Sequence, residues 1–151
     1  MTNRYEAPVT ISAENLDADF SRADIEFEGV DHSGATYEGR VFLNNPDADA
    51  STPTTMENGY AGAYHIFGHG GCYGDDMGHC EVRPRRKFDP RSAHQLTPAR
   101  KVVIATDAVR QALQKGPQLT LKIVPVVRAT TPKAGPEDVV VYEKVSIITY
   151  R

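Results

Sequence analysis

The segment 118-QLTLKIVPVV-127 decides the fold of this chain. Its apolar residues Leu119, Leu121 and Ile123 recur at every second position, which is typical of a β-strand with one buried face. We therefore expect these three side chains to point into the core. The segment is too short for a membrane span and begins directly after Gly116 and Pro117, which end whatever precedes it.

Other segments on either side of it have the same strand-like composition, and most of them are separated by turn residues. They cover residues 23–30, 35–45, 59–67, 101–106 and 138–150. In the first, Ile25 and Phe27 alternate with acidic residues. In the third, the alternation places Tyr60, Tyr64 and Ile66 on one face.

One short helix is predicted near residues 107–115, with Thr106 as its N-cap. Its buried stripe would be Val109, Ala112 and Leu113. A long irregular loop is predicted over about 68–99, where no periodicity exists. Together these features predict an all-β fold, an antiparallel β-sandwich of about seven strands, as one domain over residues 1–151.

The overall composition is that of an ordinary globular domain, with 40% hydrophobic and 25% charged residues and a net charge of −3. This charge gives no reason to expect a nucleic acid or a membrane as partner. The first residues lack the basic and apolar regions of a signal peptide, which predicts a soluble cytoplasmic protein unless it is exported with a partner.

The segment 65-HIFGHGGCYGDDMGHC-80 contains three of the five histidines and both cysteines, interleaved with glycines. Imidazole and thiolate groups are the usual ligands of Zn²⁺ and Cu(I), and four of them complete a tetrahedral site. The segment therefore predicts a metal site for copper, or for zinc. Its candidate ligands are His65, His69, Cys72, His79 and Cys80.

Two other interpretations of this segment stay open. The spacing matches no standard zinc-finger signature, and the two cysteines could instead form a disulfide in an oxidising compartment. The segment could also be a glycine-rich loop without metal. His32 and His94 lie in turn-like surroundings and are expected to be incidental.

Four basic residues within five positions, Arg83, Arg85, Arg86 and Lys87, form the run RPRRK. Such a run is usually a solvated face, but it could dock onto an acidic partner surface.

The order of motifs resembles the C-terminal β-sandwich of plant-type polyphenol oxidases, the tyrosinases and catechol oxidases. The matching motifs are GRVFLNNP (39–46), ENGYAGAYHIFGHG (57–70), RKVVIATDAVRQAL (100–113), QLTLKIVPVV (118–127) and VVYEKVSIITY (140–150). The resemblance implies a domain that is not catalytic and that covers the copper site of the enzyme core. The core's dicopper centre uses more histidines than the five of this chain.

The resemblance implies a non-catalytic, metal-binding accessory domain for a partner type-3 copper oxidase, shielding its site or handling its copper. The alternative is a protein-binding module whose loop is pinned by structural zinc or a disulfide. A third possibility is a small metal-dependent enzyme, although no general base is evident.

Overall fold

The computed structural model describes residues 7–17, 19–70, 80–127 and 139–151. In these residues the strands are β1 (Val9–Ser12), β2 (Arg22–Val30), β3 (Tyr37–Leu43), β4 (Tyr60–Ile66), β5 (Ala99–Ile104), β6 (Gln118–Val127) and β7 (Lys144–Tyr150). A short 3₁₀ helix, η1 (Met56–Asn58), precedes β4, and the α-helix α1 (Thr106–Leu113) follows β5. The predicted all-β class is confirmed.

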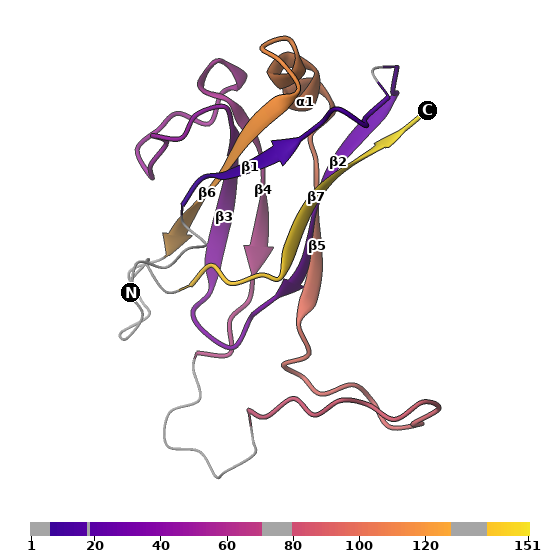
Figure 1. The fold of residues 1–151 in the computed structure, drawn as a ribbon. Coiled ribbons are helices and arrows are strands. Elements are labelled where there is room, and N and C mark those ends of the chain that lie inside the picture. Colours follow the sequence, from indigo (N-terminus) through magenta and orange to yellow (C-terminus); the bar gives the residue numbers. More distant parts are fainter. Residues whose placement is uncertain (1–6, 18, 71–79, 128–138) are drawn as a thin grey trace.

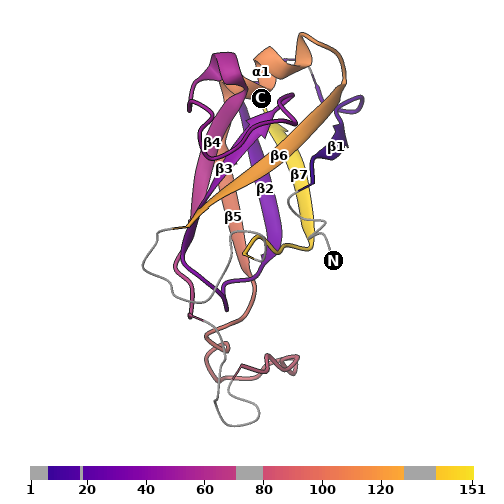
Figure 2. The same ribbon diagram turned by 90° about the vertical axis from the view of Figure 1, so that its left-hand side faces the viewer.

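The strands form two antiparallel sheets that pack face to face (Figures 1 and 2). One sheet has the order β1-β6-β3-β4 and the other the order β5-β2-β7. Helix α1 lies at one end of the sandwich, and residues 80–98, which precede β5, extend beyond the opposite end (Figure 1). The sandwich therefore has a helical end and a loop end.

The main core lies between the two sheets. Leu119, Leu121 and Ile123 of β6 are buried there, as their alternation predicts. From the opposite sheet, Ile25 and Phe27 of β2 are fully buried against them. Burying one such side chain contributes roughly 1.5–3 kcal/mol to the hydrophobic term, so this layer is the main source of stability.

Strand β1 is an element that the sequence prediction missed. It is only four residues long and pairs with the first part of β6, in a register that places Val9 opposite Leu121. Beyond this point β6 has β3 as its partner, with Pro125 opposite Gly39. A proline has no N–H to donate to a neighbouring strand. Pro125 lies in the part of β6 that pairs with β3 but lies beyond the residues paired with β1, so it is accommodated there.

The prediction that Tyr60 shares a face with Tyr64 is wrong. The register between β3 and β4 shifts at Val41/Phe42, so one residue of β4 is unpaired there. Such a bulge reverses the facing of the residues beyond it. Tyr64 therefore lies in the main core, whereas Tyr60 packs with Phe42 in a second, smaller cluster.

Gly62 makes this bulge possible. Its φ of 131° lies in the region that glycine favours, and a Cβ at this position would lie 2.6 Å from Cγ1 of Val103 on β5. The absent side chain thus lets the two sheets approach one another at this edge.

The helix forms where it was predicted, but its cap differs. Ala105 occupies the N-cap position and makes no side-chain capping bond. The Thr106 hydroxyl instead accepts a hydrogen bond from the Ala23 N–H at 3.2 Å, which ties the helix to β2. Val109 and Ala112 are buried and Leu113 is partly buried. No helix in the described residues is long and apolar enough to cross a bilayer.

Strand β7 is shorter than the predicted segment 138–150, because residues 139–143 form no regular strand. They run beside the end of β2, where the Asp31 N–H donates to the Val141 carbonyl and the Glu143 N–H to the Glu28 carbonyl, each at 2.9 Å. Val140 is nevertheless fully buried. Val140 is therefore apolar because it is buried, although it is not part of a strand.

Candidate functional site

The chain between β4 and β5 begins against the turn that joins β2 to β3. The Gly68 N–H donates to the Thr36 hydroxyl at 3.0 Å, and the His69 N–H donates to the His32 carbonyl at 2.9 Å. A Cβ at Gly68 would lie 2.2 Å from the Gly34 carbonyl oxygen, so only glycine fits there. The first residues of the connection are thus fixed to the sandwich.

The end of the connection returns to the same turn. The His32 Nε2 lies 2.8 Å from the Thr97 carbonyl oxygen. His94 accepts a hydrogen bond from the Leu96 N–H through Nδ1 at 3.1 Å, and His69 and His94 line one cavity of about 200 Å³. His32 and His94 therefore belong to the region where both ends of the connection meet the turn between β2 and β3, which we call the foot of the connection. This is contrary to the expectation that they are incidental.

The five predicted metal ligands are placed only in part. His65 is exposed on β4 opposite Glu38, and His69 lies at the foot of the connection. Cys72 and His79 lie outside the described residues. Among residues 7–17, 19–70, 80–127 and 139–151, no three His, Cys, Asp or Glu side chains converge on a point that could hold a metal ion. The metal site stays a prediction.

Cys80 is disulfide-bonded, and the chain has one other cysteine, Cys72. A sulfur within a disulfide is not a thiolate, and it is the thiolate that binds metal. In this oxidised state Cys80 does not serve as a ligand, so the predicted metal site applies to the reduced chain. The oxidised state corresponds to the disulfide alternative.

After Cys80 the chain forms a basic arm, residues 80–92, which projects beyond the loop end of the sandwich (Figures 1 and 2). Residues 81–91 contain five basic and two acidic side chains, a net charge of +3 in a chain whose total is −3. The rest of the chain therefore carries −6. Phe88, at the turn of this arm, is 89% exposed.

The outer face of β2 carries two carboxylates that are buried, Asp24 and Glu26, at 2% and 3% exposure. Arg22 covers Asp24 with two hydrogen bonds of 2.8 Å, and Arg100 from β5 covers Glu26. Hydrogen bonding to these carboxylates raises the pKa of both arginines above the ordinary value. The alternation placed the acids on the outer face, but it did not reveal that the flanking strands bury them.

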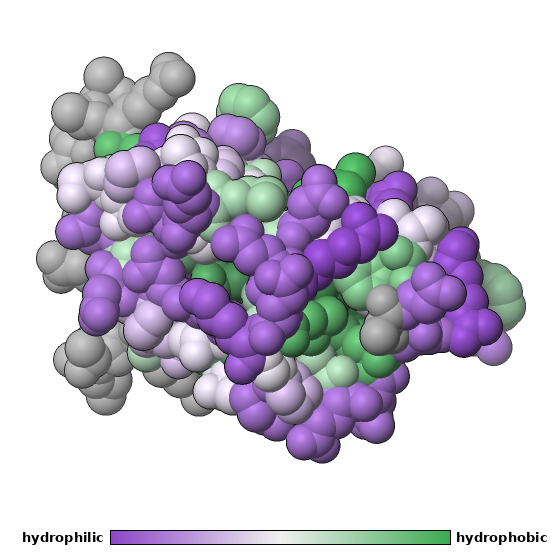
Figure 3. Space-filling view, turned by 90° about the horizontal axis from the view of Figure 1, so that it is seen from above, coloured by the Kyte–Doolittle hydropathy of each residue, from purple (hydrophilic) through white to green (hydrophobic). Residues whose placement is uncertain are grey.

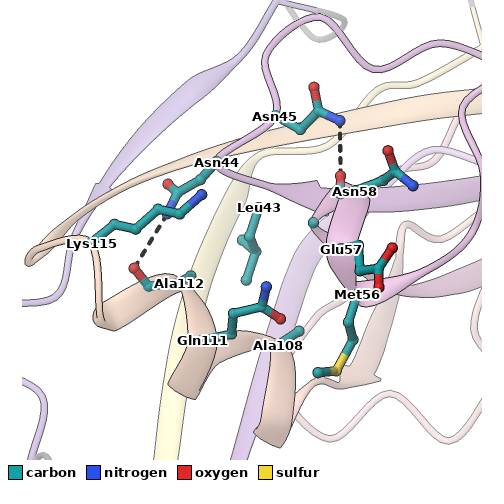
Figure 4. Close-up of a pocket in the computed structure, with 11 residues that line it drawn as sticks. Leu43, Asn44, Asn45, Met56, Glu57, Asn58, Ala108, Gln111, Ala112 and Lys115 are labelled. Atoms are coloured by element: carbon teal, nitrogen blue, oxygen red, sulfur yellow. Dashed lines mark hydrogen bonds between the residues drawn. The ribbon is translucent and has the colours of Figure 1, made fainter.

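A small pocket of about 140 Å³ lies at the helical end, between α1 and η1 (Figure 4). Its wall contains Asn44, whose amide donates to the Ala112 carbonyl at 3.3 Å and accepts from the Thr120 N–H at 3.0 Å. Asn45 donates to the Asn58 carbonyl at 2.8 Å. These amides join β3, β6, η1 and α1, so their role here is structural. From above, this end is mostly hydrophilic, with hydrophobic side chains showing between the polar ones (Figure 3).

Comparisons with known proteins find a similarity in fold but none in sequence. No family model and no curated protein sequence matches this chain. Among solved structures, a recombinant latent aurone synthase (polyphenol oxidase) aligns with a TM-score of 0.53 and 14% identity, over 95% of this chain. A latent aurone synthase (polyphenol oxidase) from natural source aligns with a TM-score of 0.54 and 16% identity, over 100% of this chain.

This likeness shows the fold. The chain has a β-sandwich similar to a part of these polyphenol oxidase structures. It spans about a quarter of the matched chains, 24% and 26% of their lengths.

Proposed function

We propose that this β-sandwich is a non-catalytic accessory domain that covers the copper site of a type-3 copper oxidase. The observation that carries the proposal is the alignment of essentially the whole chain with one quarter of a polyphenol oxidase. The order of sequence motifs supports the same assignment. The activity of the matched enzymes belongs to those enzymes, and the role proposed for this chain is to control access to such a site.

The state of Cys80 favours shielding over copper handling. Transfer of Cu(I) requires soft ligands, and a disulfide offers no thiolate. Because Cys80 is disulfide-bonded and the chain has only two cysteines, the oxidised chain offers no thiolate for copper handling. A disulfide also persists best in an oxidising compartment, which agrees with export alongside a partner and not with a cytoplasmic location.

A second candidate is a protein-binding module with a disulfide-pinned loop and a partner other than an oxidase. The specific observation for it is the way the loop is anchored. His69 and Thr97, near the two ends of the connection, both bond to His32. A connection held at both ends loses less conformational entropy when it binds another protein.

The test of the shielding proposal uses purified proteins from the source organism. The chain, with its disulfide intact, is titrated into the core of a type-3 copper oxidase that lacks its own C-terminal domain, and binding is followed by calorimetry. Saturable binding at one chain per core, with the copper content of the core unchanged, is expected. Binding with loss of copper to the chain would support copper handling instead. Absence of binding would contradict both roles and leave the second candidate.

A further inference from the structure

Phe88 is unusual in two independent ways. Its side chain is 89% exposed, although a phenyl ring gains free energy when it leaves water. Its φ is 65°, in the left-handed region that bulky residues rarely adopt. The Asp89 N–H donates to the Arg86 carbonyl at 3.2 Å, so Phe88 occupies a turn position where glycine or asparagine is favoured. A backbone outlier of this kind, observed in the structure, is a reason to propose a function for the residue.

The turn that presents Phe88 is held by the arm itself. The Arg85 guanidinium donates to the Asp89 carbonyl at 2.8 Å and also to the Arg91 carbonyl. The Asp89 carboxylate is paired with Arg91, with an Nη2 to Oδ2 distance of 2.6 Å. This pairing lowers the pKa of Asp89 below its ordinary value. The turn is thus built before any partner arrives, which reduces the entropy cost of binding.

These hydrogen bonds and ion pairs engage some of the basic residues of the arm but not others. Arg83 is paired with Glu81 at 3.4 Å, while Arg85 and Arg91 serve the turn. Among the described residues, Arg86 and Lys87 have no carboxylate partner within ion-pair distance. The Lys87 ammonium lies 5.2 Å from the centre of the Phe88 ring. The tip therefore presents one aromatic ring beside two positive charges, Arg86 and Lys87, that no carboxylate of the described residues compensates.

We propose that Phe88, flanked by Arg86 and Lys87, is the anchor by which this chain docks onto an acidic protein surface that contains an apolar pocket. Aromatic residues, phenylalanine among them, and arginine are both enriched at protein interfaces relative to the rest of the protein surface. This inference rests on the proposed function, which makes the oxidase core the first partner to test.

Charge argues for a protein as the partner and against a polyanion. Outside residues 81–91 the chain carries a net charge of −6, which would repel the phosphates of a nucleic acid or an anionic membrane. Arg86, Lys87 and one phenyl ring are also a small footprint for a bilayer, where stable attachment takes several basic residues. A local acidic patch on a protein could be bound by the tip of the arm alone.

The experiment measures binding to the oxidase core by calorimetry for variants in matched pairs. Phe88→Gly removes the ring at a position where glycine suits the backbone, and its control is Phe67→Gly, because Phe67 is 85% exposed outside the arm. Lys87→Glu changes the charge at the tip, and its control is Lys115→Glu at the helical end, where Lys115 is exposed. We expect Phe88→Gly and Lys87→Glu to weaken binding about tenfold or more, with both controls near wild type. Phe88→Leu should restore most of the affinity.

Unchanged binding of Phe88→Gly would overturn the anchor while leaving the proposed function intact. If the core does not bind the wild-type chain, the proposed function fails, and the anchor is then decided by photocrosslinking from position 88 in extract of the source organism. Crosslinks to an acidic surface of one protein, lost in Lys87→Glu, support the anchor. Crosslinks that reach nucleic acid, lipid or a second copy of this chain, or no crosslinks at all, overturn it.

Discussion

The hydroxyl oxygens of Tyr37 and Tyr64 lie 3.2 Å apart in the core between the two sheets. Burial raises the pKa of Tyr37 to about 12, although its bond to Tyr64 opposes the shift. Burial also raises the pKa of Tyr64, and the neighbouring Tyr37 adds to that effect. The pair satisfies two polar groups that would otherwise be costly in the core.

This pair predicts a loss of stability at alkaline pH. Both pKa values are raised in the folded state, so the stabilising contribution is complete below the ordinary tyrosine value of about 10 and is lost as the pH rises toward the folded values. For Tyr37 the loss amounts to about 2–3 kcal/mol between pH 10 and 12. Urea unfolding at a series of pH values measures it. Tyr37→Phe should flatten the slope, while Tyr150→Phe, at a half-exposed residue, should leave it unchanged.

The bulge at Gly62 predicts a position-specific cost for alanine. Gly62→Ala places a Cβ against Val103 and forces an unfavourable φ, so the free energy of unfolding should fall by about 1–3 kcal/mol. Gly34→Ala is the matched control, because a Cβ there meets nothing within 4 Å. Equal midpoints for the two variants in thermal unfolding would show that the close approach of the sheets is absent.

The alternation in β6 predicts the cost of opening a cavity in the main core. Leu121 is 1% exposed, so Leu121→Ala should lower the free energy of unfolding by about 2–5 kcal/mol. Ile104→Ala, at a residue that is 63% exposed, should change it by less than about 0.5 kcal/mol. A small effect at Leu121 would indicate that this layer is not packed as described.

The disulfide at Cys80 predicts the thiol count. With two cysteines in the chain, the denatured protein should show no free thiol until a reductant is added, and two thereafter. Elemental analysis of the reduced chain then tests the predicted metal site. Two free thiols before reduction, together with bound copper or zinc, would favour the metal site over the disulfide.

Strands with regular alternation could be predicted from sequence. Burial follows the period of two in the first part of β3 and of β6, and in β2 the apolar residues Ile25 and Phe27 alternate with acidic ones although both sets are buried. Strand β1 could not be predicted, since four residues carry too little pattern and their stability comes from pairing with β6. The facing of Tyr60 failed for a related reason. A bulge is a register event between two strands, and only Gly62 hinted at it.

The candidate site was predictable only as composition. The run of basic residues indicated a docking face, but that Arg83 is paired with Glu81, while Arg86 has no such partner in the part of the chain that the structure describes, depends on folded geometry. The exposure of Phe88 could not be predicted either, because an aromatic residue surrounded by charged residues belongs to no periodic pattern that would indicate burial or exposure. The foot of the connection depends on His32, which lies more than thirty residues from His69 in the sequence.

The most direct test of the shielding role is the initial rate of catechol oxidation by the oxidase core as the chain is titrated in. The chain alone should oxidise no catechol. If it covers the copper site, the rate should fall to a low plateau at one chain per core, while the copper content of the core stays constant. A rate that is independent of the chain at saturating binding would contradict shielding, and catechol oxidation by the chain alone would contradict a non-catalytic role.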